Sequence, residues 1–360
     1  MQFEFNWHIP CAGDSHWMQT RLPERAPHIT YLTKVAEAAE YAGFDRVLVP
    51  CAFSNSTYSL AAPYADSWTL GTACLAATRK IEILVAHRPG FINPGVFAQM
   101  CANADDLGGG RLALNIVTAG APGDMEQFGD VLDHDARYRR ASEFVSICKS
   151  LWTEPELNFD GEFYCMRQAR MEYKPVRPGG PPFFLAGASE AAIEMAARQA
   201  DVYMMSASTV ENIAERVADL QRRAAAHGRT MRFCVAATMF AAETDDKARE
   251  WAIDFANHAD LSVVAERTAH GRTTTSVEDI RARAGTNMHT WLTPHIWSGI
   301  AHLNYGAAWV GSYASIAELF AEYARVGVSI FQIYGYPFLE EALHVGERVV
   351  PAVKERFAAL

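Results

Sequence analysis

The sequence predicts an α/β fold, and within that class a single (β/α)8 barrel with insertions. Short apolar runs alternate with amphipathic stretches almost from end to end, in about eight units. The apolar runs are continuous enough to be buried on both faces, as parallel strands under helices are. A doubly wound open sheet has the same alternation, but a count of eight favours the closed barrel. Such a barrel needs about 250 residues, so the 360-residue chain leaves roughly 110 for insertions.

The N-terminal half contains four strand–helix units. The expected strands are the apolar runs 3–10, 46–50, 81–86 and 111–118. The expected helices are the amphipathic stretches 31–43, 67–78, 94–107 and 136–152. Gly43 closes the first of these helices, and Pro94 lies in the first turn of the third, where its missing N–H costs nothing.

The C-terminal half continues the same rhythm. Its expected strands are 183–186, 202–206, 231–241 and 328–334. Its expected helices are 190–200, 210–227, 245–258, 316–326 and 339–357.

Two stretches exceed the repeat and are expected to be insertions, at about 157–180 and 261–310. The first has Asp160-Gly161 between alternating aromatic runs, which predicts a β-hairpin. The second is long and irregular, and it predicts a mobile lid over a substrate. No internal repeat or low-complexity linker divides the chain, so residues 1–360 are expected to form one domain.

Composition and charge exclude several classes of protein. The net charge is −10, whereas a nucleic-acid-binding protein needs a basic face. The sequence has no apolar run of about 18 residues and no basic signal-peptide start, so neither membrane insertion nor export is expected. Seven scattered cysteines without C-x-x-C spacing are typical of a reducing compartment. The protein is therefore expected to be cytoplasmic.

Common catalytic motifs are absent from the sequence. It has no Walker A, G-x-G-x-x-G, H-E-x-x-H or G-x-S-x-G motif. Gly108-Gly109-Gly110 precedes a strand and is interpreted as a turn. The twelve histidines have no metal-ligand spacing, so no metal site is expected.

Chemistry in a (β/α)8 barrel collects at the C-terminal ends of the strands. The fifth strand leads into Gly187-Ala188-Ser189 at the start of a helix, where free N–H groups suit a phosphate. Ser189 is alternatively a simple N-cap of that helix. The other strand ends deliver Cys51, His87, Arg88, Asn115, Val117, Thr118 and Tyr336.

These motifs, in this order and spacing, resemble the bacterial-luciferase-like flavin monooxygenases, most closely the alkanesulfonate monooxygenase branch. The resemblance covers nearly the whole chain. The residues that carry it are 13–16 (GDSH), 88–90 (RPG), 115–118 (NIVT), 134–138 (HDARY), 158–161 (NFDG), 187–189 (GAS), 294–297 (PHIW) and 335–337 (GYP). It implies a luciferase-like TIM barrel that binds reduced FMN at its C-terminal mouth and reacts with O2. It also implies a separate NAD(P)H:flavin reductase as partner, and a homo-oligomer.

The resemblance assigns roles to individual residues. The residues expected against the flavin are Asn115, Val117 and Thr118. Those expected at its phosphate are Tyr138, Gly187, Ala188 and Ser189, and the resemblance favours Ser189 as a phosphate ligand, a role that is compatible with its capping the helix. For Asn115 the alternative is a polar residue that satisfies strand-end backbone groups.

The catalytic candidates each have a structural alternative. His87 and Arg88 are candidates for stabilising a peroxide or a substrate anion, although Arg88 equally suits an ion pair inside the mouth. Tyr336 is the candidate proton donor, or else a packed tyrosine with a satisfied hydroxyl. The expected substrate pocket is formed by Cys51, Ser206, Ala236, Thr238 and Trp297.

The sequence departs from the alkanesulfonate enzymes where a sulfonate would bind. Ala236-Ala237-Thr238 replaces their Arg-x-His pair on the seventh strand, and Asn304 replaces an arginine in the mobile insertion. Ser206 stands where they have a tryptophan. Because two arginines and a histidine are missing, a neutral substrate such as a sulfone or a heterocyclic amide competes with a sulfonate.

Three functions follow from these observations. The first is an FMNH2- and O2-dependent monooxygenase of a two-component system, which oxidises a small sulfur- or nitrogen-containing molecule through a flavin (hydro)peroxide. The second is a flavin- or deazaflavin-dependent oxidoreductase that transfers a hydride. The third is a non-catalytic flavin-binding barrel, whose only support is the missing arginine–histidine pair.

Overall fold

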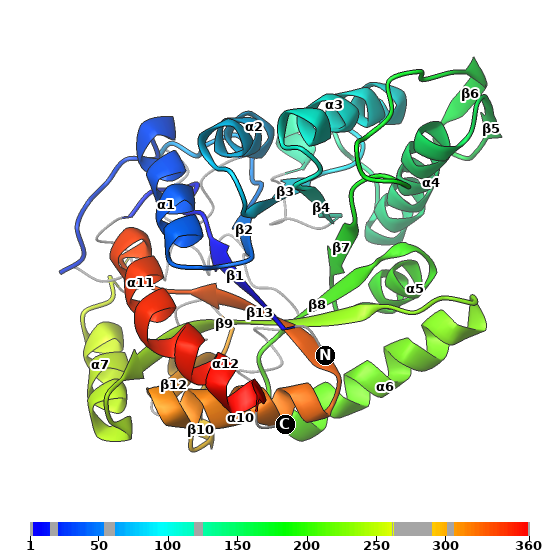
Figure 1. The fold of residues 1–360 in the computed structure, drawn as a ribbon. Coiled ribbons are helices and arrows are strands. Elements are labelled where there is room, and N and C mark those ends of the chain that lie inside the picture. Colours follow the sequence, from blue (N-terminus) through cyan, green and yellow to red (C-terminus); the bar gives the residue numbers. More distant parts are fainter. Residues whose placement is uncertain are drawn as a thin grey trace.

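The computed structural model contains a closed barrel of eight parallel strands surrounded by helices (Figure 1). It describes residues 3–14, 21–53, 62–118, 125–260, 262, 290–300 and 306–358. The barrel strands are β1 (Glu4–His8), β2 (Arg46–Val49), β3 (Glu82–His87), β4 (Leu112–Ile116), β7 (Phe183–Ala186), β8 (Val202–Ser206), β9 (Arg232–Ala242) and β13 (Val328–Tyr334). Pairing of β1 with β13, and of β9 with both β8 and β13, closes the sheet. The predicted (β/α)8 fold is confirmed.

Helices cover the outside of the barrel (Figure 1). They are α1 (Ile29–Tyr41), α2 (Ser67–Ala77), α3 (Pro94–Leu107), α4 (His134–Thr153), α5 (Glu190–Gln199), α6 (Val210–Ala226), α7 (Asp245–Asn257), α10 (Tyr313–Arg325), α11 (Phe338–His344) and α12 (Val350–Ala358). Several begin with a capping side chain, such as Asn93 before α3 and Thr209 before α6, which satisfies a free N–H of the first turn.

The C-terminal helix differs from its prediction. The sequence predicts one helix over 339–357, but a π-helical turn at Val345–Val349 separates α11 from α12. Pro351 follows this turn and has no N–H to donate to the preceding turn, which accounts for the irregular hydrogen bonding there.

The two regions expected to be insertions contain small strands. In the first, β5 (Leu157–Asp160) and β6 (Cys165–Ala169) form the predicted antiparallel hairpin. The carboxylate of Glu143 accepts backbone N–H groups of Glu162, Phe163 and Tyr164 in its turn. In the second, β10 (Trp291–Thr293), β11 (Ile296–Trp297) and β12 (Ala308–Ser312) extend the sheet from the end of β9. Residues 263–289, on which the lid prediction mainly depends, lie outside the described residues.

Alternation along the strands divides the core into two layers. Side chains that point outward pack between the sheet and the helices. Side chains that point inward fill the middle of the lumen: Leu48, Leu84, Ala113, Phe184, Val202, Met204, Cys234 and Ile330. Because the period of a strand is two residues, this assignment also fixes which strand-end side chains face the lumen.

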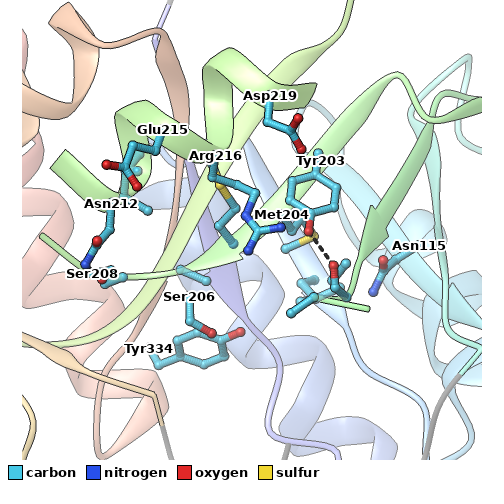
Figure 2. A pocket seen from close by; sticks show the side chains of 18 residues that line it. Asn115, Tyr203, Met204, Ser206, Ser208, Asn212, Glu215, Arg216, Asp219 and Tyr334 are labelled. Carbon is cyan, nitrogen blue, oxygen red and sulfur yellow. Dashed lines mark hydrogen bonds between the residues drawn. The ribbon is translucent and has the colours of Figure 1, made fainter. Parts of the chain in front are cut away.

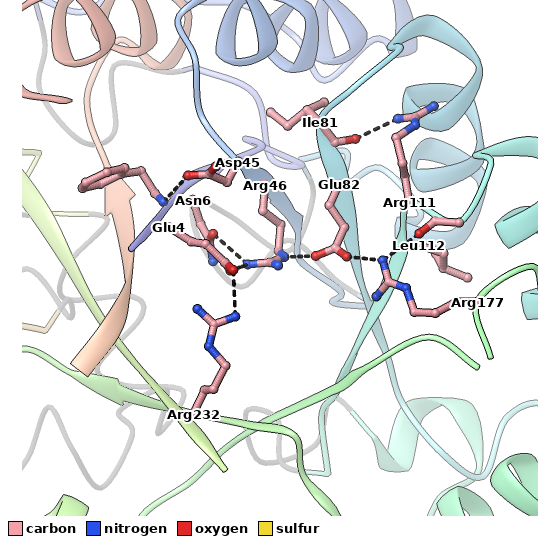
Figure 3. Close-up of polar contacts among 12 residues, drawn as sticks. Glu4, Asn6, Asp45, Arg46, Ile81, Glu82, Arg111, Leu112, Arg177 and Arg232 are labelled. Carbon is pink, nitrogen blue, oxygen red and sulfur yellow. Dashed lines mark hydrogen bonds and ion pairs between the residues drawn. The ribbon is translucent and has the colours of Figure 1, made fainter. Parts of the chain in front are cut away.

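A network of ion pairs closes the N-terminal end of the lumen (Figure 3). Arg46 is buried there and bonds Glu4 (3.0 Å) and Glu82, with its guanidinium 4.9 Å from the ring of Phe184. Arg232 bonds the other oxygen of Glu4 at 2.7 Å. Burial alone would raise the pKa of Glu4, but the charges and hydrogen bonds of Arg46 and Arg232 hold it below its usual value.

We predict that Arg46→Met lowers the free energy of unfolding by about 3–5 kcal/mol, because it removes the cation shared by two largely buried carboxylates, Glu4 and Glu82. Urea denaturation followed by circular dichroism measures the loss. Arg21→Met is the control, since Arg21 and Asp254 form an exposed ion pair whose removal costs about 1 kcal/mol or less. Equal losses in the two variants would show that the buried network adds nothing beyond a surface pair.

Candidate functional site

A cavity of about 730 Å³ opens at the C-terminal ends of the barrel strands and continues against α6 (Figure 2). This volume is in the range of small-molecule sites. Its strand side is formed by inward-facing residues, namely Leu48, Asn115, Ala186, Ser206, Ala236 and Tyr334. Ligands of (β/α)8 barrels bind at this end, so the cavity is the candidate active site.

Asn115 is a buried amide on the cavity wall. It lies on β4 two residues beyond the inward-facing Ala113, so it also points into the lumen. It is only 9% exposed, and its side-chain oxygen has no hydrogen-bond partner. Because an unsatisfied buried polar group is costly, this oxygen indicates a position where a ligand donates a hydrogen bond.

The turn at Gly187 is held between two tyrosines. The Tyr203 hydroxyl donates to the Gly187 carbonyl oxygen. On the other side, a Cβ added at Gly187 would lie 2.9 Å from the Tyr138 hydroxyl and 2.7 Å from Cβ of Ala192. With φ at +138°, the position requires glycine. The structure thus brings together Tyr138 and the Gly187 turn, which are far apart in the sequence.

Ser189 caps α5, as one reading of the sequence predicts. Its hydroxyl accepts the N–H of Ala192 at 3.3 Å. The N–H groups of Glu190 and Ala191, also in the first turn, have no acceptor within the helix and lie beside the Gly187 turn. Backbone donors at such a helix start favour an anion.

Tyr334 is the tyrosine of the last strand that lines the cavity (Figure 2). The His8 ring lies behind it, with 4.6 Å between the ring centroids. Burial raises the pKa of Tyr334 and lowers that of His8 to about 3. At neutral pH the phenol is therefore protonated and the imidazole is uncharged, so Tyr334 offers a hydrogen-bond donor.

Comparison with known proteins identifies the family. Residues 4–329 match the family model described as luciferase-like monooxygenase. The chain belongs to the luciferase-like monooxygenase family.

Solved structures of the same fold cover nearly the whole chain. Long-chain alkane monooxygenase LadA matches with a TM-score of 0.81 and 21% identity, over 99% of this chain and 92% of that one. DmoA from Hyphomicrobium sulfonivorans matches with a TM-score of 0.80 and 18% identity, over 99% and 89%. An F420-dependent secondary alcohol dehydrogenase matches with a TM-score of 0.69 and 18% identity, over 98% and 99%. The fold thus occurs both in monooxygenases and in an F420-dependent enzyme.

The sequence-predicted catalytic residues of this family member lie in different places. Tyr336 is buried against Phe255 and Phe338 at ring distances of 5.5 and 4.8 Å, and it is not among the residues that line the cavity. Arg88 is buried at the mouth, with its guanidinium 4.8 Å from the ring of Phe53 and Nη1 3.3 Å from Sδ of Met125.

His87 faces the helices and not the lumen. It follows the outward-facing Val85 on β3 by two residues, and its ring stacks on Phe97 at 3.9 Å and on Phe144 at 5.3 Å. Nε2 has no hydrogen-bond partner, and burial lowers the pKa of His87 to about 3. The side chain is an uncharged member of an aromatic stack.

Among the predicted pocket residues, Ser206 and Ala236 line the cavity. Thr238 and Trp297 are buried but are not among its lining residues, and Cys51 is partly exposed. Of the expected flavin contacts, Thr118 is buried and Val117 is half-buried near the end of β4. Asn304 lies outside the described residues, as do Ser15 and His16 of the first motif.

Sequence reasoning missed the helix side of the cavity. Four polar residues of α6 line it: Asn212, Glu215, Arg216 and Asp219. Their spacing places them along one face of α6. In a sequence such a polar face is usually interpreted as solvent-exposed, and only the packing of α6 beside β8 shows that it lines the cavity. In the part of the chain that is described, no group of histidine, cysteine or acidic residues has the arrangement of a metal site.

We predict that replacing His87 by leucine reduces the acid sensitivity of the fold. The pKa of His87 is about 3 in the folded state against about 6.5 when unfolded, so protons favour unfolding as the pH falls below 6.5. Urea denaturation at pH 7 and pH 5 should show a smaller decrease in the free energy of unfolding for His87→Leu than for the wild type. The substitution also changes packing, but this affects the free energy of unfolding equally at both pH values and does not alter the decrease between them.

His344→Leu provides a control of opposite sign. A hydrogen bond that His344 donates to the Glu341 carboxylate raises the pKa of His344, so this histidine stabilises the fold at pH 5 and loses that contribution as the pH rises through its raised pKa. Its removal should therefore increase acid sensitivity. Identical pH responses in the two variants contradict the assignment of His87 to the uncharged stack.

Proposed function

We propose that the protein is a monooxygenase that uses reduced FMN and O2, and that the flavin occupies the cavity at the barrel mouth. The observation that carries this proposal is the unpartnered Asn115 oxygen in the same cavity as the Gly187 turn. A flavin has ring N–H groups for such an oxygen and a phosphate for the helix start beside the turn. These residues fit the cofactor.

The residues that would hold FMN belong to two strands and two helices. Asn115 on β4 would accept from the flavin ring, and the N–H groups at the start of α5 would bind its phosphate. Tyr203 on β8 holds the Gly187 turn by its hydrogen bond, and the Tyr138 hydroxyl on α4 lies beside the same turn. When bound, reduced FMN supplies the electrons that activate O2.

The other cavity residues exclude water and donate hydrogen bonds. Leu48, Met204 and Ala236 give the lumen side an apolar surface, which limits solvent around the reacting groups. Tyr334 stays protonated, so it donates a hydrogen bond to the flavin or the substrate and does not act as a base. The sequence holds no dinucleotide fingerprint, which supports a separate flavin reductase as the source of reduced FMN.

A neutral sulfur- or nitrogen-containing molecule is the substrate class we infer. Ser206 and Ala236 give the strand side of the cavity no cation. A sulfonate bound against the strand side would lack the bidentate arginine partners that desolvated anions need.

Hydride transfer with F420 is the second candidate, supported by the fold of the F420-dependent alcohol dehydrogenase. Agreement with that structure is lower than with LadA and DmoA, with TM-scores of 0.69 against 0.81 and 0.80. The monooxygenase therefore remains the preferred proposal.

We predict that the protein binds reduced FMN more tightly than oxidised FMN or F420. Anaerobic titration measures the three affinities, and rapid mixing with O2 then follows flavin absorbance. Bound reduced FMN should return to the oxidised spectrum in more than one phase, unlike the free flavin in buffer. Preference for F420 without a reaction with O2 favours hydride transfer, and binding of none of the three overturns both enzyme functions.

We also predict that sulfones or lactams are turned over with kcat/KM about ten-fold or more above alkanesulfonates, because none of the described residues that form the strand side of the cavity is an arginine. The assay couples the protein to a generic flavin reductase with NADH, adds catalase, and quantifies product by mass spectrometry. Reactions without substrate or without the protein are controls. A preference for sulfonates contradicts the neutral-substrate inference.

A further inference from the structure

Arg216 is a cation inside the cavity that the proposed function has not used. It lies on the side of α6 that faces β8, and its guanidinium extends into the cavity towards Tyr203 and Ser206 (Figure 2). The opposite wall of the cavity, formed by strand ends, carries no charged side chain among the described lining residues.

No carboxylate in the described part of the chain neutralises Arg216. Asp219, one turn further along α6, already bonds Arg222 and Arg223. Glu190, at the start of α5, also bonds Arg223. Glu215 is directed away from the guanidinium in Figure 2. The nearby acids are thus engaged or turned away, and Arg216 keeps its charge available in the cavity.

The charge of Arg216 acts on the end of the cavity that contains the Gly187 turn. Burial raises the pKa of Tyr203 to about 12, and the positive charge of Arg216 opposes that rise. The Tyr203 hydroxyl in turn donates to the Gly187 carbonyl oxygen. Arg216 and the free N–H groups at the start of α5 therefore flank the same turn.

We propose that Arg216 binds the phosphate of the flavin and forms the side-chain half of an anion site whose backbone half is the start of α5. This inference rests on the proposed use of FMN. A phosphate carries up to two negative charges, whereas backbone N–H groups at a helix start supply only partial positive charges. An arginine adds a full charge and a two-pronged donor that matches phosphate oxygens. The protein has a net charge of −10, so this local positive charge offsets the repulsion that a phosphate dianion would otherwise meet.

The test compares two flavins that differ only in the phosphate. Anaerobic titrations measure the affinity of the full-length protein for reduced FMN and for reduced riboflavin. Arg216→Gln should weaken FMN binding about ten- to a hundred-fold, the range for a lost charged hydrogen bond. Riboflavin binding should change less than two-fold. The loss should shrink as salt is raised, because the contact is electrostatic.

Two controls isolate the effect. Arg222→Gln removes an exposed arginine from the same helix, and it should leave the affinity for both flavins unchanged. Thermal unfolding of Arg216→Gln should match the wild type, which shows that the variant is folded.

The outcomes separate the anion site from the cofactor assignment. An equal loss for FMN and riboflavin, or no loss for FMN, overturns the phosphate contact. If the wild type binds F420 and not FMN, the proposed cofactor is wrong, and the same variant is then titrated with F420 and with its phosphate-free headgroup. A selective loss for F420 supports an anion site at Arg216. A wild type that binds no flavin or F420 overturns both proposals.

Discussion

The lumen of a closed eight-stranded barrel has a fixed width, and every inward-facing side chain of this protein must fit within it. The chain meets this constraint in layers along the barrel axis. At the base, Arg46 lies between two glutamates, so charge is buried only as a paired network. Eight apolar side chains fill the middle. At the top the inward positions include Ala186, Ser206 and Ala236, whose small size leaves the cavity open. The cavity therefore exists because the small side chains of the uppermost layer do not fill the lumen.

The same alternation decides which strand-end residues can reach a ligand. Ala113 and Asn115 share one side of β4, so an amide follows a core alanine into the cavity. Val85 and His87 share the opposite side of β3, and the imidazole therefore joins the aromatic stack under the helices. On β13, Ile330 points inward and Tyr334 lines the cavity. If the register of a strand shifted by one residue, its cavity-facing side chains would point towards the helices and its helix-facing side chains would point into the lumen.

Much of the fold was predictable from the sequence, because buried parallel strands are continuous apolar runs that stand out from amphipathic helices. The helix Pro94–Leu107 was predicted to the residue, since a proline and a glycine mark its two ends. The strands β10 and β11 were not, as two or three residues are too few to show a period. The Gly187 turn was found through its glycine and serine. Tyr203 and Arg216 were not, because their roles depend on how β8 and α6 pack against each other.

The cavity separates charge from the apolar surface, and this separation bears on how one pocket would hold the proposed charged cofactor and neutral substrate. Its cation and free N–H groups lie on the side of α5 and α6, whereas apolar and small uncharged side chains line the lumen side. Moving a charge from water into the lumen would carry a large desolvation cost without a partner there. With the proposed cofactor, a phosphate and an uncharged ring system would therefore be oriented by the cavity itself, with the phosphate towards α6 and the ring towards Asn115. A small anion has no comparable partner on the lumen side, so the same arrangement disfavours a charged molecule there.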